Sequence, residues 1–262
     1  MRIAFAGDRD ISVKVLKLII ESGVKPLSLF VSDKRIQTHA KELVKICTSL
    51  LNPNHIFAGS SFRKKKSTSM LQQLNLDYII CIHFPYIVPK EILSIPKYGV
   101  INLHPAYLPY NRGWHTPSWA ILEDTPIGAT LHFMNEGVDT GDIIHQKKID
   151  ISPGDTADSL YRKLKELEFQ VFNDIWQTLL EGVPTRIPQE PRTGTVHNKS
   201  DLFQDKIQKI DLDRFVKAES LIRQFRALTT NDLSEAAYYD IGKNRYRVQV
   251  KITEEQLSQS RS

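Results

Sequence analysis

Asn102 and His104 are the first residues of this sequence whose types and spacing suggest chemistry. They stand two positions apart in the run GVINLH (99–104), which is predicted to be a strand ended by Pro105. Alternate residues of a strand point to the same face, so the amide and the imidazole are expected to lie side by side. In open α/β sheets, ligands bind at the carboxyl ends of the strands. The pair therefore indicates either a functional site or a polar strand end satisfied by the following turn.

A second polar cluster follows in the loop 135–142, directly after another predicted strand. Gly137 and Gly141 permit unusual backbone conformations there, while Asp139 and Asp142 supply carboxylates. A carboxylate beside an imidazole orients the ring and raises its pKa, and an amide beside both can donate to a developing oxyanion. An Asn, His and Asp set suits the attack of an amine on a carbonyl. Covalent acyl transfer is less expected, since no serine or cysteine stands at the corresponding strand end.

The elements that must position these residues alternate along the first two thirds of the chain. Strands are predicted at 2–6, 27–31, 77–82, 99–104, 127–134 and 143–149, and helices at 11–21, 39–50, 67–74, 116–123 and 157–181. This alternation predicts an α/β fold, a Rossmann-like and mostly parallel sheet with helices on both faces. The run 77–82 is almost continuously apolar, as in a strand buried on both faces. The strand at 143–149 is expected to be antiparallel and near an edge.

The rest of the chain is interpreted as a linker and a small appendage. The predicted division is a catalytic domain at 1–183, a linker with little pattern at 184–199, and a small C-terminal α+β domain at 200–262. Within the last part, a helix is predicted at 215–227. A strand at 236–240 is predicted to form a β-hairpin with the strictly alternating, half-buried run 245–252.

Composition excludes several classes of protein. The chain has 262 residues, of which 41% are hydrophobic and 25% charged, as in soluble globular proteins with a real core. Its two cysteines, Cys47 and Cys81, stand in apolar runs, which predicts buried free thiols in a reducing compartment. No apolar stretch approaches the roughly 18 to 20 residues of a membrane span, and the N-terminus does not resemble a signal peptide. A cytoplasmic protein without a membrane partner is expected.

Charge and histidine spacing limit the possible partners further. The formal net charge of +5 does not demand a nucleic-acid partner. The one dense basic run, 63–66, is expected to be a solvated loop or a helix start. His115, His132 and His145 lack the spacing of metal ligands, so no metal is expected. Of these, His132 lies on an apolar strand and is interpreted as a core residue or a support for the site.

The first loop offers a phosphate site or a helix cap. Gly7-Asp8-Arg9-Asp10 is not a dinucleotide-binding fingerprint, so a nicotinamide cofactor is not expected. However, Arg9 beside a helix N-terminus could hold a phosphate. Asp8 or Asp10 could instead cap the helix, and the two interpretations remain open.

Two motifs together resemble the folate-dependent formyltransferases. INLHPAYLPYNRGWHTPSWAI and, further on, GATLHFMNEGVDTGDII are similar to the segments that carry catalysis in that family, and the resemblance covers about residues 1–182. The family includes glycinamide ribonucleotide, methionyl-tRNA and nucleotide-sugar formyltransferases. The resemblance implies the formyltransferase fold and a catalytic triad of Asn102, His104 and Asp139, while Asp142 matches no triad position.

The same resemblance implies a formyl donor, 10-formyltetrahydrofolate. In this family the pterin is held by the loop after the fourth strand, here 83–89, and by the loop that carries the triad aspartate. The residues expected to contact the folate are Phe84, Tyr86, Ile87, Val88, Met134, Gly137 and Asp139.

The segment PYNRGWHTP looks like that of the nucleotide-sugar N-formyltransferases. It implies transfer to the amine of a nucleotide-linked, dTDP or similar, amino-dideoxy sugar, in the synthesis of cell-surface polysaccharide of the lipopolysaccharide O-antigen type. The substrate contacts predicted from this resemblance, from the first loop and from base stacking are Gly7, Arg9, Asn111, Arg112, Trp114, Tyr238 and Tyr239. A homodimer is possible, and no nucleic-acid partner is expected.

Two alternatives remain. One is a short methionyl-tRNA formyltransferase, although that enzyme carries a larger C-terminal barrel and usually a small residue after the Arg-Gly. The other is a non-catalytic folate- or nucleotide-binding protein on the same scaffold, against which the complete triad argues. The tail resembles that of the sugar enzymes but departs from it in TTNDLSEAAYY, where a proline-rich segment is more usual.

Overall fold

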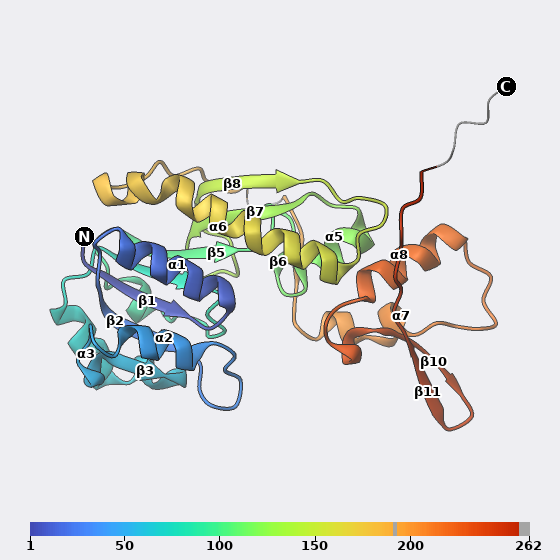
Figure 1. Ribbon diagram of the computed structural model, residues 1–262, viewed down its shortest axis with the longest axis horizontal. Coiled ribbons are helices and arrows are strands. Elements are labelled where there is room, and N and C mark those ends of the chain that lie inside the picture. The colour runs from blue at the N-terminus through green and yellow to red at the C-terminus, as the bar shows by residue number, and fades with distance from the viewer. Residues whose placement is uncertain (191–192, 257–262) are drawn as a thin grey trace.

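A computed structural model describes residues 1–190 and 193–256, and it places a seven-stranded sheet at the centre of the larger domain (Figure 1). The order across the sheet is β3-β2-β1-β4-β5-β7-β8. Its strands are β1 (Ile3–Gly7), β2 (Pro26–Val31), β3 (Ile56–Ala58), β4 (Tyr78–Ile82), β5 (Gly99–His104), β7 (Ile127–Phe133) and β8 (Ile143–Ile149). The first five run parallel, whereas β7 is antiparallel to both β5 and β8. The predicted mostly parallel α/β sheet is thus confirmed, with β8 at the antiparallel edge.

Helices cover both faces of this sheet, as predicted. They are α1 (Asp10–Glu21), α2 (Ala40–Cys47), α3 (Lys65–Gln73), α4 (Lys90–Leu93), α5 (Thr116–Glu123) and α6 (Ala157–Glu181). Neighbouring residues of β1 point to opposite faces of the sheet. Phe5 packs on one face in a core cluster with α1, α2 and α6, while Ala4 packs on the other face in a cluster with α3 and α4. The basic run 63–66 leads into α3, as one of its two interpretations predicted. The short β3 and α4 have too few residues for a periodic pattern, and sequence analysis missed both.

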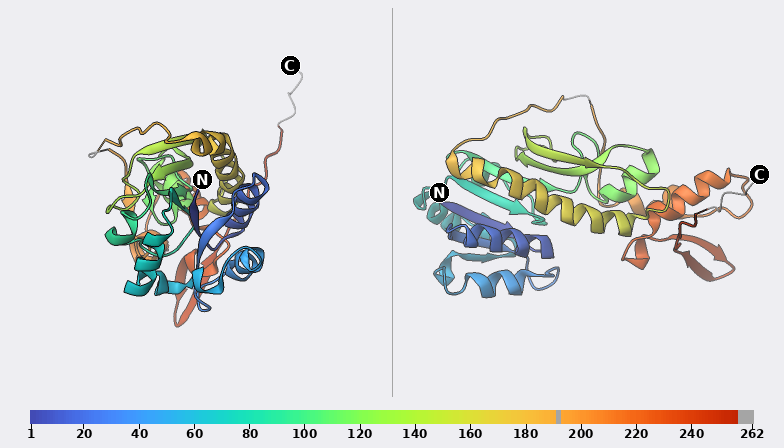
Figure 2. Two further views of the ribbon diagram at one scale, coloured as in Figure 1. Left: turned by 90° about the vertical axis from the view of Figure 1, so that its left-hand side faces the viewer. Right: turned by 45° about the horizontal axis from the view of Figure 1, so that its top comes forward.

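The C-terminal part contains α7 (Asp205–Gln208), α8 (Ala218–Leu228) and the hairpin β10 (Ala237–Ile241) with β11 (Asn244–Val248). It packs on α5 (Figure 2). There Trp119 joins a buried cluster with Leu228 and Ala237. The predicted helix at 215–227 begins only at Ala218. The strand predicted to reach residue 252 ends at Val248. Tyr246, which lies on the face of this strand that was predicted to be buried, is 43% exposed.

The segment predicted as a linker with little pattern returns to the part of the chain that forms the seven-stranded sheet. Ile187 forms a bridge with Ile143, and β9 (Val196–His197) pairs in parallel with β6 (Arg112–Gly113). These pairings lay the segment against the loop that follows β5. The division at 1–183, 184–199 and 200–262 remains a prediction, and residues 191–192 and 257–262 lie outside the described part of the chain.

Burial bears out the expectation for the two cysteines. Cys47 and Cys81 are buried free thiols, and burial raises the pKa of Cys81 to about 12. None of the helices in the described residues is both long enough and apolar enough to cross a membrane.

Candidate active site

Asn102 and His104 lie at the carboxyl end of β5, near the middle of the sheet, as their spacing predicted. Strand β7 runs antiparallel beside them, and its register sets His132 opposite Asn102. His104 is 7% exposed and His132 only 1%. Sequence analysis assigned His132 a core or supporting role, and cross-strand register brings it to the amide of Asn102.

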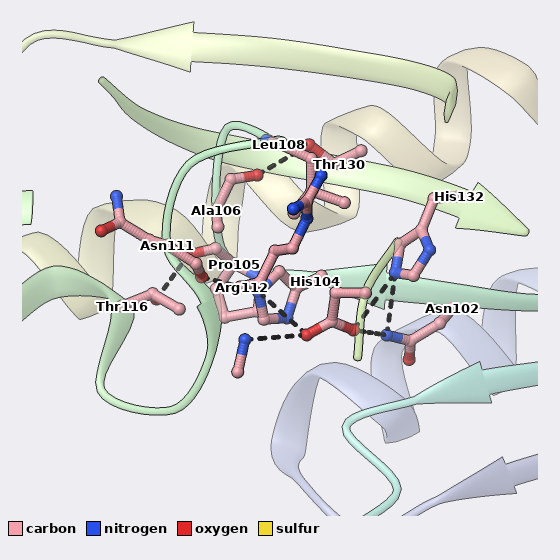
Figure 3. A network of polar contacts seen from close by, with 12 residues as sticks. Asn102, His104, Pro105, Ala106, Leu108, Asn111, Arg112, Thr116, Thr130 and His132 are labelled. Atoms are coloured by element: carbon pink, nitrogen blue, oxygen red, sulfur yellow. Dashed lines mark hydrogen bonds and ion pairs between the residues drawn. The ribbon is translucent and has the colours of Figure 1, made fainter. Parts of the chain in front are cut away.

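Figure 3 shows Asn102, His104 and His132 at this end of the sheet. The loop between β7 and β8 brings Asp139 to Asn102 and His104. One carboxylate oxygen, Oδ2, lies 3.5 Å from Nε2 of His104, and the other, Oδ1, lies 3.5 Å from Nδ2 of Asn102. Asp139 occupies the left-handed backbone region, with φ of 50°. The backbone N–H of Gly113 donates to Oδ2 over 2.9 Å. The three predicted triad residues are therefore assembled around a single carboxylate.

His132 joins the cluster as a fourth polar side chain. Its Nε2 lies 3.2 Å from Nδ2 of Asn102 and 3.5 Å from Oδ1 of Asp139. Its Nδ1 lies 2.8 Å from the carbonyl oxygen of Phe133, which can only accept a hydrogen bond. The neutral ring therefore carries its proton on Nδ1, and Nε2 accepts from the Asn102 amide. This contact fixes which way the amide points.

Burial and charge together set the ionisation of the site. Burial lowers the pKa of His104, and the neighbouring Asp139 offsets this only in part. Burial also raises the pKa of Asp139, but the two imidazoles and the Gly113 N–H outweigh it, so the pKa of this carboxyl lies well below its usual range. At neutral pH the site thus holds a carboxylate and a neutral His104 imidazole.

The surroundings of His104 also select its tautomer. Nε2 faces the carbonyl oxygen of Asn111 at 3.1 Å and the Asp139 carboxylate. Both are acceptors, so the neutral ring carries its proton on Nε2 and leaves Nδ1 as the basic nitrogen. A base, an amide donor and a fixed carboxylate at one sheet edge can take a proton from an amine and stabilise charge on a carbonyl oxygen.

The second predicted carboxylate, Asp142, lies apart from the triad. It is 37% exposed and stands 3.9 Å from the guanidinium of Arg186. This placement agrees with its lack of a match to a triad position.

The predicted folate loop borders the same end of the sheet. Phe84 and Tyr86 are part of an aromatic cluster, Val88 is buried, and Ile87 is 82% exposed. A cavity of about 470 Å³ lies beside α4, lined by Lys90, Leu93, Ser94, Met134, Asn135, Glu136 and Gly137. The cavity thus includes Met134 and Gly137, two of the residues predicted to contact the folate.

The side chains of Asn111 and Arg112 form hydrogen bonds within the protein. Asn111 is fully buried, and its amide donates to Thr125 and to the carbonyl of Pro126. Arg112 is 8% exposed, and its guanidinium donates to Gln189. These contacts correct the prediction that both side chains meet the substrate.

Trp114, three residues after Asn111, differs from them. It is 43% exposed, so its predicted contact with the sugar remains a prediction.

At the end of β1, the first loop supplies a helix cap, though to α2, while Arg9 lies at the start of α1. The carboxylate of Asp8 accepts from the backbone N–H groups of Thr38, His39 and Ala40, so it caps α2 rather than its own helix. Arg9 is at the N-terminus of α1 beside Gly7, with 39% of its side chain exposed. A contact between Arg9 and a phosphate therefore remains a prediction, as does that of Gly7.

The two tyrosines predicted to stack on a base have different environments. Tyr238 is 2% exposed, its hydroxyl donates to Asp205, and the guanidinium of Arg245 lies 3.6 Å from its ring centroid. Its ring is thus not open to a base, which corrects that prediction. Tyr239 is half-buried and stacks on Tyr246, and its predicted role remains untested.

Two protein-family models match the chain. One, described as "Formyl transferase", matches residues 1–175, and the other, described as "N-formyltransferase dimerization C-terminal domain", matches residues 204–254. The first match covers the whole sheet and every residue of the triad.

Individual proteins agree with these matches. Methionyl-tRNA formyltransferase of Ehrlichia ruminantium is 33% identical over 233 residues, which are 87% of this chain and 74% of that protein. The crystal structure of a 4-N formyltransferase from Francisella tularensis has a TM-score of 0.80 at 25% identity, covering 97% of this chain and 98% of its own. A formyltransferase from Anoxybacillus kamchatkensis, in complex with UDP-4,6-dideoxy-4-formamido-L-AltNAc and tetrahydrofolate, has a TM-score of 0.53 at 26% identity, covering 77% and 87%.

Proposed function

The chain belongs to the formyl transferase family, and on that premise we propose that it moves a formyl group from 10-formyltetrahydrofolate to the amine of a nucleotide-linked amino sugar. The observation that carries this proposal is the contact of Asn102 and His104 with the carboxylate of Asp139, whose side chain is only 15% exposed. The sugar is proposed to be a dTDP- or similarly activated amino-dideoxy sugar, destined for cell-surface polysaccharide.

The residues beside the triad fit a folate donor. The cavity next to Met134 and Gly137 opens beside the loop that carries Asp139, so a bound pterin would lie close to the triad. The exposed Ile87 supplies an apolar contact on the neighbouring loop. When bound there, 10-formyltetrahydrofolate supplies the activated formyl carbon.

The three triad side chains divide the work of the transfer. Asn102 directs one Nδ2 hydrogen to His132, and the other, held only by the 3.5 Å contact with Asp139, would donate to the formyl oxygen as that oxygen gains negative charge. His104, which carries no proton on Nδ1, would take the proton that the amine loses as the amine nitrogen bonds to the formyl carbon. The same proton would pass to the folate nitrogen as its bond to the formyl carbon breaks. Asp139 holds the His104 ring through Nε2 and stabilises it once it is charged.

Structural similarity over the whole chain supports a sugar acceptor. The fold agrees with that of the Francisella 4-N formyltransferase, with a TM-score of 0.80 at 25% identity. The nucleotide sugar in the Anoxybacillus complex supports the same class of acceptor. The exposed Arg9 and Trp114 are proposed to meet the diphosphate and the sugar.

A panel of acceptors tests the proposal directly. We expect the protein to formylate a dTDP- or UDP-linked amino sugar when 10-formyltetrahydrofolate is present, with only mild salt dependence of KM. A nucleotide sugar offers two phosphates, whereas transfer RNA binding weakens steeply with salt as counterions are released. The measurement is formyl transfer to each amino sugar and to methionyl-tRNA at two salt concentrations.

The exposed lysines of the basic run provide the control. Neutralising Lys64, Lys65 and Lys66 should leave sugar formylation unchanged, since they lie on the surface around the start of α3. If the protein formylates methionyl-tRNA and loses this activity when the three lysines are neutralised, the sugar assignment is wrong and the chain is a methionyl-tRNA formyltransferase. Binding of folate without turnover on any acceptor would instead favour a non-catalytic binding protein.

We also propose that the C-terminal domain joins two copies of the chain. The matching family model is described as a dimerization domain, and this part of the chain exposes large apolar side chains. They include Leu212, Phe215, Val216, Ile222, Ile241 and Tyr246. Phe215 is fully exposed, and solvent contact of this kind is costly for so large an apolar side chain.

Replacing Phe215 by serine is expected to weaken the dimer by about 10-fold or more in Kd, the scale of an aromatic hot spot. Analytical ultracentrifugation over a concentration series measures the change. Ile36→Ser is the matched control, because Ile36 is also exposed but lies in the catalytic domain. A Phe215→Ser protein as dimeric as the Ile36→Ser protein would contradict this surface.

A further inference from the structure

Gln189 is the residue through which the segment between the two domains reaches the active site. Its half-buried side chain makes four hydrogen bonds, all to the two segments that surround the triad carboxylate. Neither the spacing of motifs nor the local pattern around 184–199 indicated a role for it.

The amide nitrogen of Gln189 holds the loop that carries Asp139. Nε2 donates to the carbonyl oxygens of Asp139 and Gly141, over 2.9 and 2.7 Å. Both of its hydrogens are thereby used on one loop. Asp139 has a left-handed φ of 50°, a conformation that a non-glycine residue keeps only when its surroundings hold it.

The amide oxygen of Gln189 holds the opposite side of the same carboxylate. Oε1 accepts from Nε and Nη2 of Arg112, over 3.2 and 2.8 Å. Arg112 directly precedes Gly113, whose N–H donates to Oδ2 of Asp139. One side chain therefore fixes both the backbone of Asp139 and the strand that binds its carboxylate.

We propose that Gln189 is a positioning residue for Asp139, placing the carboxylate against His104. The proposal rests on the proposed function for its kinetic consequence, but its structural consequence does not depend on any acceptor. Without the two donated bonds, the Asp139 loop loses its tie to the linker and the carboxylate moves away from the ring.

The sign of the effect on His104 follows from charge. The Asp139 carboxylate favours the protonated ring and so raises the pKa of His104, against the burial that lowers it. When Asp139 moves away, burial remains and the attraction weakens. The pKa of His104 is therefore expected to be lower in such a variant than in the unmodified protein.

Two substitutions separate the two halves of the Gln189 amide. Gln189→Met removes all four hydrogen bonds with little change in size. Gln189→Glu keeps an acceptor for Arg112 but sets a carboxylate against the two carbonyl oxygens. Glu190→Gln is the matched control, since Glu190 is the exposed neighbour in the same segment.

NMR titration of ¹³C-labelled histidine provides the readout, with a His104→Gln protein to assign the resonance. We expect the His104 titration to move to lower pH by about half a unit in Gln189→Met, a fraction of the ~1 to 3 units that an adjacent charge produces. In Gln189→Glu the added carboxylate attracts the protonated ring, so the titration should lie above that of Gln189→Met. The Glu190→Gln protein should titrate like the unmodified one. A His104 titration unchanged in Gln189→Met would overturn the proposal.

Kinetics with an accepted amino sugar add a second test. We expect kcat to fall by about 10- to 100-fold in both variants, the cost of moving a catalytic group by about 1 Å, with little change in KM for the acceptor. A rise in KM with unchanged kcat would overturn a positioning role. Because the NMR titration needs no acceptor, failure of the sugar assignment leaves it intact and is seen separately.

Discussion

Replacing His104 by alanine is expected to lower kcat by about 10² to 10⁴-fold, the usual contribution of a general base. Asn102→Ala should cost a similar factor, on the scale of one lost oxyanion donor. In the structure both side chains end at the rim of the sheet and meet the same carboxylate, so each substitution removes a group that the others cannot replace. The measurement is the single-turnover rate of formyl transfer with saturating donor and acceptor.

The control for this prediction is a histidine elsewhere on the same sheet. His145 lies on the edge strand β8 and contacts Asp174 at the surface, so His145→Ala should retain nearly full turnover. Circular dichroism and thermal unfolding verify that the His104 and Asn102 variants remain folded. Turnover in either variant close to that of His145→Ala would reject the mechanism proposed for the triad.

The second large effect is expected at Gly113, where the site depends on backbone rather than on side chains. A Cβ at this position would lie 2.2 Å from the carbonyl oxygen of His197, in the pairing of β6 with β9. Gly113→Ala must therefore separate the two strands and displace the N–H that donates to Asp139. We expect kcat to fall by about 10²-fold, as for a misplaced catalytic group. We also expect a loss of about 1 to 3 kcal/mol in the free energy of unfolding from the clash.

Gly23 makes a nearly ideal comparison for this substitution. Its φ of +89° matches the +90° of Gly113, but no atom lies within 4 Å of its would-be Cβ. Gly23→Ala therefore carries the backbone cost alone, about 1 to 2 kcal/mol for a left-handed residue, and should leave kcat unchanged. Equal losses of stability and equal activity in the two alanine variants would show that the β6–β9 contact does not support the site.

Local pattern in the sequence was sufficient for the longer elements of the sheet domain and for half of the site. Asn102 and His104 share one strand, so the two-residue period alone places both side chains on the same face. The apolar run at 77–82 and the alternation of strands with helices likewise predict a buried parallel sheet, because burial on both faces requires apolar residues at successive positions. The triad position of Asp139 came from resemblance to a family, since local spacing did not separate it from Asp142.

The remaining part of the site was decided by contacts between segments far apart in the chain. His132 reaches Asn102 through the register of two antiparallel strands, and Gln189 reaches the Asp139 loop from a segment 50 residues away. Tertiary packing also pairs the guanidinium of Arg112 with Gln189 and buries Tyr238. Sequence analysis had assigned both residues to substrate binding. A sequence pattern reports only the period and polarity of its own element. Contacts between polar groups across the sheet depend on the register of the strands and on where later segments of the chain pack. Both are set only when the whole core packs.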